Sequence, residues 1–272
     1  MVSQISANSQ QRPIRQDPVV LAGMHRSGTS LFARILADLG LFLGDRLEQH
    51  HESLFFLEQN EWILNRVHGG WDTPTNLAWL FEQPYVCDRL VEELTNRIHS
   101  EDFTQSYIGS TVDWDNPKLV WGWKDPRNTL TWFLWQRIFP AAKFIFIHRN
   151  GVDVASSLKA RTDNFIQSED RLKSQLFDTN IGRFNSLRCA SLDRCFQLWE
   201  EYNFLFYQQR SCHPQTPFFT LSYEDLLGNT EQTLRSALRF LQVEIDESAI
   251  ASVCQSINPS RRYSFLSNSQ LL

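Results

Sequence analysis

The sequence of 272 residues predicts an α/β fold, in which helices flank both faces of a parallel β-sheet of about four to five strands. One observation is that short apolar segments of strand length alternate with longer segments of helical periodicity. A second is that the first apolar segment, residues 18–24, leads through a glycine-containing turn directly into a helical pattern. Strands separated by helices favour parallel pairing, because each helix carries the chain back across the sheet.

The first strand, turn and helix are predicted to form an anion-binding loop. Gly23 and Gly28 have the spacing of a P-loop, but Thr29 stands where a loop that binds nucleoside triphosphates has lysine. The cation lies inside the loop instead, at Arg26. Backbone N–H groups and a helix N-terminus at such a turn favour anions, although an ordinary glycine turn would share the spacing. We therefore expect a P-loop-like fold whose loop holds a phosphate or sulfate with Arg26, Ser27, Thr29 and Ser30.

Further elements follow in order along the chain. The periodicity predicts helices over residues 52–67 and 86–98, then a polar surface connection over 101–117. A buried strand is expected at 119–124, and Asp125 and Pro126 form a typical helix start. The clearest strand is 143–148, after which Gly151 opens a helix that runs through Lys159.

The last third of the chain begins with a polar segment, 161–186, which lacks periodicity and is predicted to be a mobile excursion. It is followed by predicted elements over 187–209 (helix), 218–221 (strand), 231–241 and 247–256 (both helices). Residues 1–17 are polar and rich in Gln and Ser, so we expect a disordered N-terminal tail before one domain at 18–272.

The composition narrows the class of protein. A hydrophobic content of 42%, with 20 Phe and 9 Trp, indicates a globular chain with an aromatic-rich core. The net charge of -5 argues against a general nucleic-acid binder. Five cysteines without a C-x-x-C pair predict neither a disulfide framework nor a zinc site. Without an apolar run long enough for a transmembrane helix, we expect a soluble cytoplasmic protein.

Three strand ends carry cations. The first strand ends at the Arg26 loop, the second at Lys124, and the third at His148 and Arg149. Because parallel strands end at the same edge of a sheet, these side chains should together form a polyanion pocket. Ser157 follows Arg149 by eight residues, which suits two groups that grip one phosphate. A surface ion pair is the alternative interpretation of Arg149.

The motifs HRSGTSL and FIHRNGVDVASSL resemble the 5′-phosphosulfate loop and the 3′-phosphate element of sulfotransferases that use 3′-phosphoadenylyl sulfate (PAPS). WGWKDPRN and SYEDLLGNTEQTLRSALRFL are similar to further blocks of the bacterial, carbohydrate-type and tyrosylprotein-type branches. The resemblance spans about residues 18–262. It departs at Gly151, where many members have Pro, and at Arg26, where cytosolic members have Lys.

The resemblance implies a role for each matching residue. The phosphosulfate would be held by Arg26, Ser27, Gly28, Thr29 and Ser30, and the 3′-phosphate by Arg149 and Ser157. Lys124 would approach the transferring sulfuryl group, and no metal would be required. Arg261 and Arg262 resemble the basic C-terminal element that closes over the 3′-phosphate, with an unstructured basic tail as the alternative.

Sulfuryl transfer also needs a base for the acceptor hydroxyl. We predict Glu58, an acidic residue in the strongly apolar segment FFLEQNEW, whose surroundings should raise its pKa. A helix-surface carboxylate is the alternative interpretation of this position. Competing candidates for the base are Glu48, Glu52, His50, His51 and His25.

The predicted activity is therefore transfer of the sulfuryl group of PAPS to an acceptor hydroxyl on a glycan, lipid or small molecule. The alternatives are an atypical P-loop kinase and a non-catalytic protein that binds adenine nucleotides. Segments 68–84 and 162–186 are candidate walls of the acceptor site.

Overall fold

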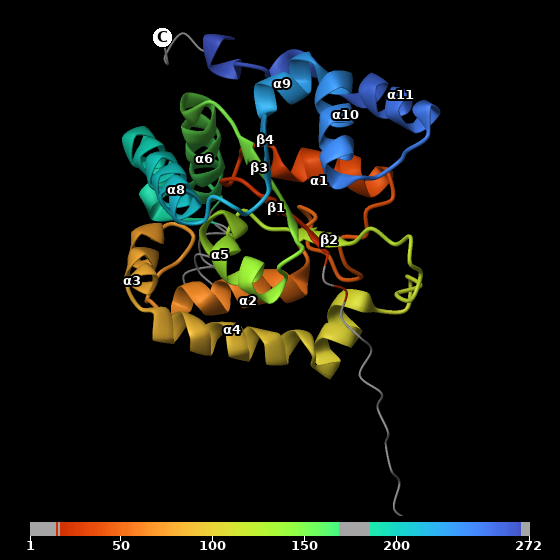
Figure 1. Cartoon of the computed structure of the whole chain (residues 1–272). Coiled ribbons are helices and arrows are strands. Elements are labelled where there is room, and N and C mark those ends of the chain that lie inside the picture. The colour runs from red at the N-terminus through yellow and green to blue at the C-terminus, as the bar shows by residue number, and fades with distance from the viewer. Residues whose placement is uncertain (1–14, 16, 169–184, 268–272) are drawn as a thin grey trace, which may run out of the picture.

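The computed structural model describes residues 15, 17–168 and 185–267. Its described strands form one parallel sheet in the order β2-β1-β3-β4 (Figure 1). Helices cover both faces of this sheet, so the predicted fold class is confirmed. The strands are β1 (Val19–Ala22), β2 (Gly122–Lys124), β3 (Lys143–His148) and β4 (Phe218–Ser222).

Alternate residues of β1 face opposite sides of the sheet. Val19 and Leu21 pack into a cluster with α1 (Thr29–Asp38), α10 (Thr230–Leu241) and α11 (Glu247–Ser256). Val20 and Ala22 pack into a larger cluster on the other face. The longer helices of this second cluster are α2 (Leu54–Asn65), α4 (Pro84–Ile98), α5 (Asn128–Ile138), α6 (Gly151–Ile166) and α8 (Leu192–Cys212).

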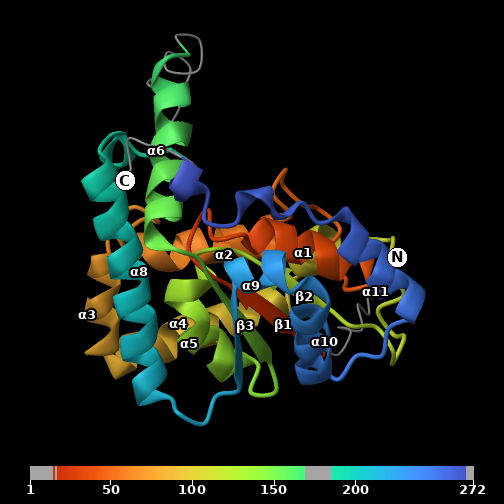
Figure 2. The same ribbon diagram turned by 90° about the horizontal axis from the view of Figure 1, so that it is seen from above.

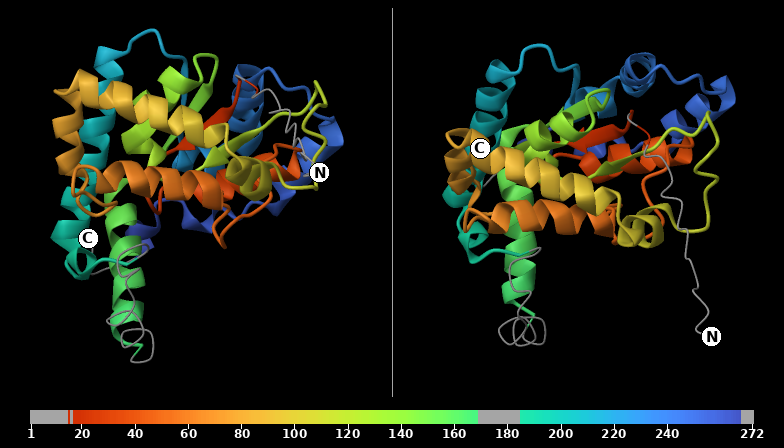
Figure 3. Two further views of the ribbon diagram at one scale, coloured as in Figure 1. Left: turned by 90° about the horizontal axis from the view of Figure 1, so that it is seen from below. Right: turned by 60° about the horizontal axis from the view of Figure 1, so that its bottom comes forward.

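The two faces are visible from several directions. In Figure 2, α10 and α11 lie on the side of the molecule away from α6 and α8. Figure 3 shows α2 and α4 side by side beneath the sheet, where Arg97 of α4 lies 4.0 Å over the ring of Trp62 in α2. None of the described helices is long and apolar enough to cross a membrane. The shorter elements are η1 (Pro74–Leu77), α3 (Ala78–Phe81), η2 (Phe103–Ile108), η3 (Leu187–Ala190), α9 (Tyr223–Gly228), η4 (Pro259–Arg261) and η5 (Ser264–Ser267).

Some predicted boundaries are wrong for local reasons. The predicted surface connection 101–117 contains the π-helix η2, whose residue Tyr107 is buried and donates a hydrogen bond to the Gly122 carbonyl at 2.5 Å. Helix α5 begins at Asn128 rather than at Pro126, because the Asp125 carboxylate accepts from the Arg127 N–H at 2.8 Å and holds a separate turn.

Other predictions fall partly outside the described residues. Helix α6 continues to Ile166, well beyond the predicted end at Lys159, so the predicted excursion at 161–186 begins later than expected. Its residues 169–184 lie outside the described part of the chain, as do residues 1–14 and 16 of the predicted tail. The helix predicted over 187–209 is divided into η3 and α8, and α8 extends to Cys212.

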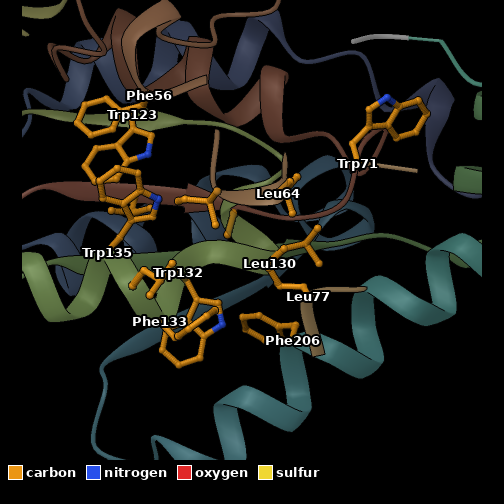
Figure 4. Close-up of a cluster of buried hydrophobic side chains, with 14 of the residues drawn as sticks. Phe56, Leu64, Trp71, Leu77, Trp123, Leu130, Trp132, Phe133, Trp135 and Phe206 are labelled. Atoms are coloured by element: carbon orange, nitrogen blue, oxygen red, sulfur yellow. The ribbon is translucent and has the colours of Figure 1, made fainter. Parts of the chain in front are cut away.

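Stacked aromatic rings join β2 to α2 and α5. The ring of Phe56 lies 3.7 Å from that of Trp123 with an interplanar angle of 3°, and Trp135 meets Trp123 edge-on at 5.3 Å (Figure 4). All three side chains are fully buried. Such aromatic pairs add about 0.5–1.5 kcal/mol beyond the burial of their surface. They fix the position of β2, the strand that ends at Lys124.

A buried amide organises the turn after β2. Asn60 of α2 donates to Asp125 Oδ2 at 3.0 Å and to Asn128 Oδ1 at 2.8 Å. Its own oxygen accepts from Thr131 Oγ1 at 2.7 Å and from Trp135 Nε1 at 2.9 Å. Every polar atom of this fully buried side chain therefore has a partner.

We expect Asn60→Leu to lower the free energy of unfolding by about 2–4 kcal/mol, because it leaves several buried polar groups unpaired. Urea unfolding followed by circular dichroism measures the loss. The control is Asn65→Leu, an exposed position on the same helix, which should change stability by less than about 0.5 kcal/mol. Equal losses in the two variants would contradict a structural role for the Asn60 network.

Candidate functional site

The loop between β1 and α1 has a shape that its glycines make possible. Gly23 and Gly28 adopt φ angles of +143° and +91°, where other residues are strained. A Cβ at Gly23 would lie 2.3 Å from the Ile147 carbonyl oxygen, and one at Gly28 would lie 2.2 Å from the ring of Tyr223. The loop therefore lies directly against β3 and the start of α9.

Helix α1 begins at this loop without a side-chain cap. Its N-cap residue is Gly28, and its first turn contains no acidic residue. Ser27 and Thr29 are buried there, whereas Ser30 is partly exposed. The positive end of the helix dipole is thus not offset by a carboxylate of its own turn, which favours an anion at this end of α1.

The two predicted anion motifs are adjacent in the structure. Arg26 Nε donates a hydrogen bond to Ser157 Oγ at 2.8 Å, and Arg149 Nη1 donates to the Arg26 carbonyl oxygen at 3.2 Å. Burial, followed by the cations of Arg149 and Arg261, lowers the pKa of Arg26. Because like charges this close repel one another, an anion beside the two guanidinium groups would stabilise the arrangement.

The Arg149 guanidinium is held from several sides. It lies 3.4 Å from Asp153 Oδ2 and 4.5 Å over the ring of Tyr223, and it donates to the Arg261 carbonyl oxygen at 3.4 Å. Asn150 caps α6 by accepting from the Val152 N–H at 3.0 Å. Asn150 thus caps the helix, and Asp153 braces Arg149. Arg149 is nine-tenths buried, and its Nε has no hydrogen-bond partner among the described residues.

The C-terminal segment packs over α6. Asp153 Oδ1 accepts from Ser264 Oγ at 2.6 Å and from the Phe265 N–H at 2.8 Å. The alternative of an unstructured basic tail is therefore wrong for Arg261 and Arg262, which lie in and beside η4. Both side chains are exposed, and the guanidinium of Arg262 packs against α9.

Lys124 is the centre of a buried polar cluster at the end of β2. Its Nζ donates to Ser30 Oγ at 3.1 Å, to the His50 carbonyl oxygen at 3.2 Å and to Glu52 Oε1 at 2.7 Å. Lys124 and Glu52 are 1% and 4% exposed. The other carboxylate oxygen of Glu52 lies 3.7 Å from Arg127 Nη1 and makes no hydrogen bond within the described chain. That oxygen can therefore accept a proton or a hydrogen bond from a ligand.

Arg127 is a member of this cluster that the sequence analysis missed. It is 1% exposed and lies 3.1 Å from Asp125 Oδ1 and 3.3 Å from Glu61 Oε1. Burial disfavours its cation, but Asp125, Glu52 and Glu61 more than compensate and raise its pKa. Its closeness in sequence to Lys124, with an acidic residue between them, was a signal that could have identified it.

The prediction that Glu58 lies in apolar surroundings is wrong. Glu58 is exposed on α2, because the neighbouring residues Leu57 and Gln59 occupy the two inward sides of the helix. Glu48 has a structural role, since it accepts hydrogen bonds from the N–H groups of His50 and Glu52. Among the predicted candidates for the base, Glu52 is the carboxylate in direct contact with Lys124.

A hollow of 390 Å³ opens beside the start of α1. It extends from Ser30 and His50, at the Lys124 cluster, to Tyr223 and Arg261. Its remaining walls are Leu31, Arg34, Gln49, His51, Leu227, Ser256, Ile257 and Asn258. No group of three or more His, Cys, Asp or Glu side chains that could hold a metal ion occurs within residues 15, 17–168 and 185–267.

His25, in the loop between β1 and α1, packs against Trp71. It is 6% exposed, and its ring centroid lies 4.7 Å from that of Trp71. Its Nε2 atom is buried without a hydrogen-bond partner in the described chain. Burial, followed by the nearby cations of Arg127, Arg161, Lys124 and Arg26, lowers its pKa well below the usual value. The folded protein thus holds His25 as a neutral imidazole.

Comparison with known proteins gives one family. A sequence model described as the sulfotransferase family matches residues 18–247. Curated protein sequences give no significant match.

Similar solved structures are sulfotransferases of low sequence identity. They include STF9 from Mycobacterium avium, with 15% identity over 89% of this chain and 68% of that one at a TM-score of 0.49. STF1 from Mycobacterium tuberculosis H37Rv has 13% identity over 89% and 72%, also with a TM-score of 0.49. The sulfotransferase domain of the Synechococcus PCC 7002 olefin synthase has 18% identity over 96% and 87%, with a TM-score of 0.45.

The buried imidazole of His25 makes stability depend on pH in a predictable direction. Unfolded His takes up a proton near pH 6.5, whereas folded His25 resists it. Stability from this residue is therefore full above about pH 6.5 and falls by up to about 1.4 kcal/mol per pH unit below it, until the folded pKa is reached.

Urea unfolding between pH 7.5 and pH 5 should give a shallower decline for His25→Asn than for the wild type. The exposed residue His68 provides the control, because His68→Asn should keep the wild-type slope. Identical slopes in the wild type and His25→Asn would show that His25 is not held neutral.

Proposed function

Because this chain belongs to the sulfotransferase family, we propose that it transfers the sulfuryl group of PAPS to an acceptor hydroxyl, and that it does so without a metal ion. The observation that carries the proposal is the contact between the two anion motifs. Arg26 bonds to Ser157, and Arg149 bonds to the main chain of Arg26. A nucleotide with phosphates at both its 5′ and 3′ positions suits two adjacent cation groups.

The residues fit such a nucleotide. The loop residues Arg26, Ser27, Gly28, Thr29 and Ser30 would hold the phosphosulfate at the N-terminus of α1, and Arg149 with Ser157 would hold the 3′-phosphate. The unpaired Nε of Arg149 leaves a donor for this purpose. The 390 Å³ hollow has the size of a small-molecule site and runs between Ser30 and Arg261. We assign Arg261, which lines the hollow, to nucleotide binding. We assign no such role to Arg262, whose guanidinium packs against α9.

PAPS supplies an activated sulfuryl group, and the protein stabilises the charge that develops on the leaving oxygen. Lys124 and Arg26 are the cations for this purpose. Lys124 reaches Ser30, so it connects the end of β2 to the anion loop. Positioning and charge stabilisation account for most of the catalysis in related phosphoryl transfers, and we apply the same principle here.

We propose Glu52, in place of Glu58, as the base for the acceptor hydroxyl. Glu52 is buried beside Lys124, and its Oε2 has no hydrogen-bond partner among the described residues. An anionic donor beside Ser30 would compete for the Lys124 ammonium, which would free the Glu52 carboxylate to accept a hydrogen bond from the acceptor hydroxyl. Glu58, in contrast, is exposed on α2.

Nucleotide titration by calorimetry tests the proposed function. We expect 3′,5′-adenosine bisphosphate to bind without magnesium, and at least about tenfold more tightly than ATP with magnesium, because Arg149 pairs with the 3′-phosphate. Arg149→Ala should weaken this binding by about 10- to 100-fold and change the affinity for adenosine 5′-phosphosulfate by less than about twofold. The control is Arg194→Ala, at an exposed position on α8.

Tighter binding of ATP with magnesium would favour a kinase instead. Equal losses for both ligands in Arg149→Ala would remove the 3′-phosphate role of Arg149. Tight nucleotide binding without transfer to any acceptor would favour a non-catalytic nucleotide-binding protein.

The assignment of the base predicts different effects for two carboxylates. Glu52→Gln should reduce kcat by about 10²- to 10⁴-fold, whereas Glu58→Gln should leave kcat within about twofold of the wild type. Labelled PAPS and a panel of hydroxylated acceptors measure both values. In Glu52→Gln, the affinity for 3′,5′-adenosine bisphosphate should also remain within about twofold of the wild type, which a purely structural defect would not allow. A fully active Glu52→Gln variant would exclude Glu52 as the base.

A further inference from the structure

Arg161 is a half-buried cation that none of the proposed steps uses. It lies on α6 four residues after Ser157, so the two side chains occupy the same face of the helix, one turn apart. Ser157 is the residue that bonds to Arg26. Arg161 therefore extends the site along α6, beyond the anion motifs.

Two buried nitrogen atoms of the Arg161 guanidinium, Nε and one terminal nitrogen, have no hydrogen-bond partner within the described chain. Its central carbon lies 5.0 Å over the ring of Trp71. Burial, followed by the nearby cation of Arg26, lowers its pKa to about 10, so the group remains charged at neutral pH. An unpaired buried charge is costly, and the cost is removed when an anion binds.

The residues next to Arg161 are held in place by contacts of their own. The ring of His25 lies 4.7 Å from that of Trp71, and His25 Nε2 is also buried without a partner. Tyr202 donates a hydrogen bond to the Trp71 carbonyl oxygen at 2.8 Å, which fixes the main chain beneath the indole. An indole, a neutral imidazole and a cation side by side can bind an organic group that carries a negative charge.

Arg161 is not part of the hydrogen-bonded group of residues proposed to bind the nucleotide. Arg26, Ser157 and Arg149 are connected by direct hydrogen bonds. Arg161 contacts instead Trp71, which lies between α2 and η1 and belongs to none of the strand-end loops. Burial lowers the pKa of Arg161, and the carboxylate of Glu52, the proposed base, acts in the opposite direction. Arg161 thus lies one helical turn from Ser157 and within electrostatic range of the proposed base.

We propose that Arg161, over Trp71 and beside His25, binds an oxyanion on the acceptor, so that the acceptor is a hydroxyl compound bearing a carboxylate, phosphate or sulfate group. This inference rests on the proposed function, because it identifies the class of acceptor for the same site. The planar guanidinium provides the paired donors that such a group accepts, and Lys cannot reproduce that geometry.

The test compares pairs of probes in which one member carries an anionic group and the other a neutral hydroxyl at the same position. Suitable pairs are p-nitrophenyl glucuronide with p-nitrophenyl glucoside, 4-hydroxybenzoate with 4-hydroxybenzyl alcohol, and a sugar phosphate with its parent sugar. Each probe is titrated by calorimetry into the full chain, with and without 3′,5′-adenosine bisphosphate. We expect at least one charged probe to bind about 10- to 100-fold more tightly than its neutral partner, as a charge-assisted bidentate contact predicts.

Substitutions then assign the preference to Arg161. Arg161→Gln should bring the ratio of charged to neutral affinity close to one, and Arg161→Lys should give an intermediate ratio. Arg66→Gln is the matched control, because Arg66 also lies over a tryptophan ring, 5.3 Å from that of Trp62, but is exposed. The affinity for 3′,5′-adenosine bisphosphate should remain within about twofold in Arg161→Gln, since its phosphates are assigned to other cations.

Three results would overturn the inference. They are equal binding of charged and neutral probes in every pair, an unchanged ratio in Arg161→Gln, and a loss of nucleotide affinity in Arg161→Gln as large as the loss for the charged probe. Failure of the proposed function is seen separately, as absent nucleotide binding by the wild type. In that case the charge preference is still measured by the titrations without nucleotide.

Discussion

The parallel pairing of β1 with β2 and β3 is the constraint on which the rest of this structure depends. In this register Leu21 lies opposite both Lys124 and Ile145, so all three strands end at one edge of the sheet. Lys124 is the last residue of β2, and the loops that follow β1 and β3 carry Arg26 and Arg149. An antiparallel β2 or β3 would have placed its cation at the opposite edge, away from the proposed polyanion pocket.

Cations gathered at one edge of the sheet repel one another, and only some of them are paired with carboxylates in the described chain. Lys124 is paired with Glu52, and Arg149 with Asp153. Two other arginines, Arg26 and Arg161, have no carboxylate partner among the described residues; Arg26 bonds to a serine and Arg161 lies over a tryptophan. Although the protein has a net charge of -5, it therefore keeps uncompensated positive charge where anionic ligands are proposed to bind.

Helix α2 connects the hydrophobic core to this chemistry. Phe56 stacks on Trp123 of β2, and Asn60 holds the turn that follows the same strand. Glu52, just before the helix, then reaches Lys124 at the end of that strand. Aromatic packing, a buried amide and an ion pair thus all hold β2 and the turn after it in place. The alignment of Lys124 with the anion loop is a consequence of all three.

The sequence by itself determined the class of fold, the four described strands and the residues of both anion motifs. These features depend on local information: apolar segments of strand length, glycines at Gly23 and Gly28, and the eight-residue spacing from Arg149 to Ser157. Only the tertiary structure decided that Ser157 bonds to Arg26, that Glu52 rather than Glu58 lies beside Lys124, and that two guanidinium nitrogens of Arg161 are buried without a partner among the described residues. Apolar neighbours in sequence could not identify the buried carboxylate, because a helix turns adjacent residues to different sides. Contacts between residues more than 70 positions apart depend on how strands and helices pack, which no local pattern records.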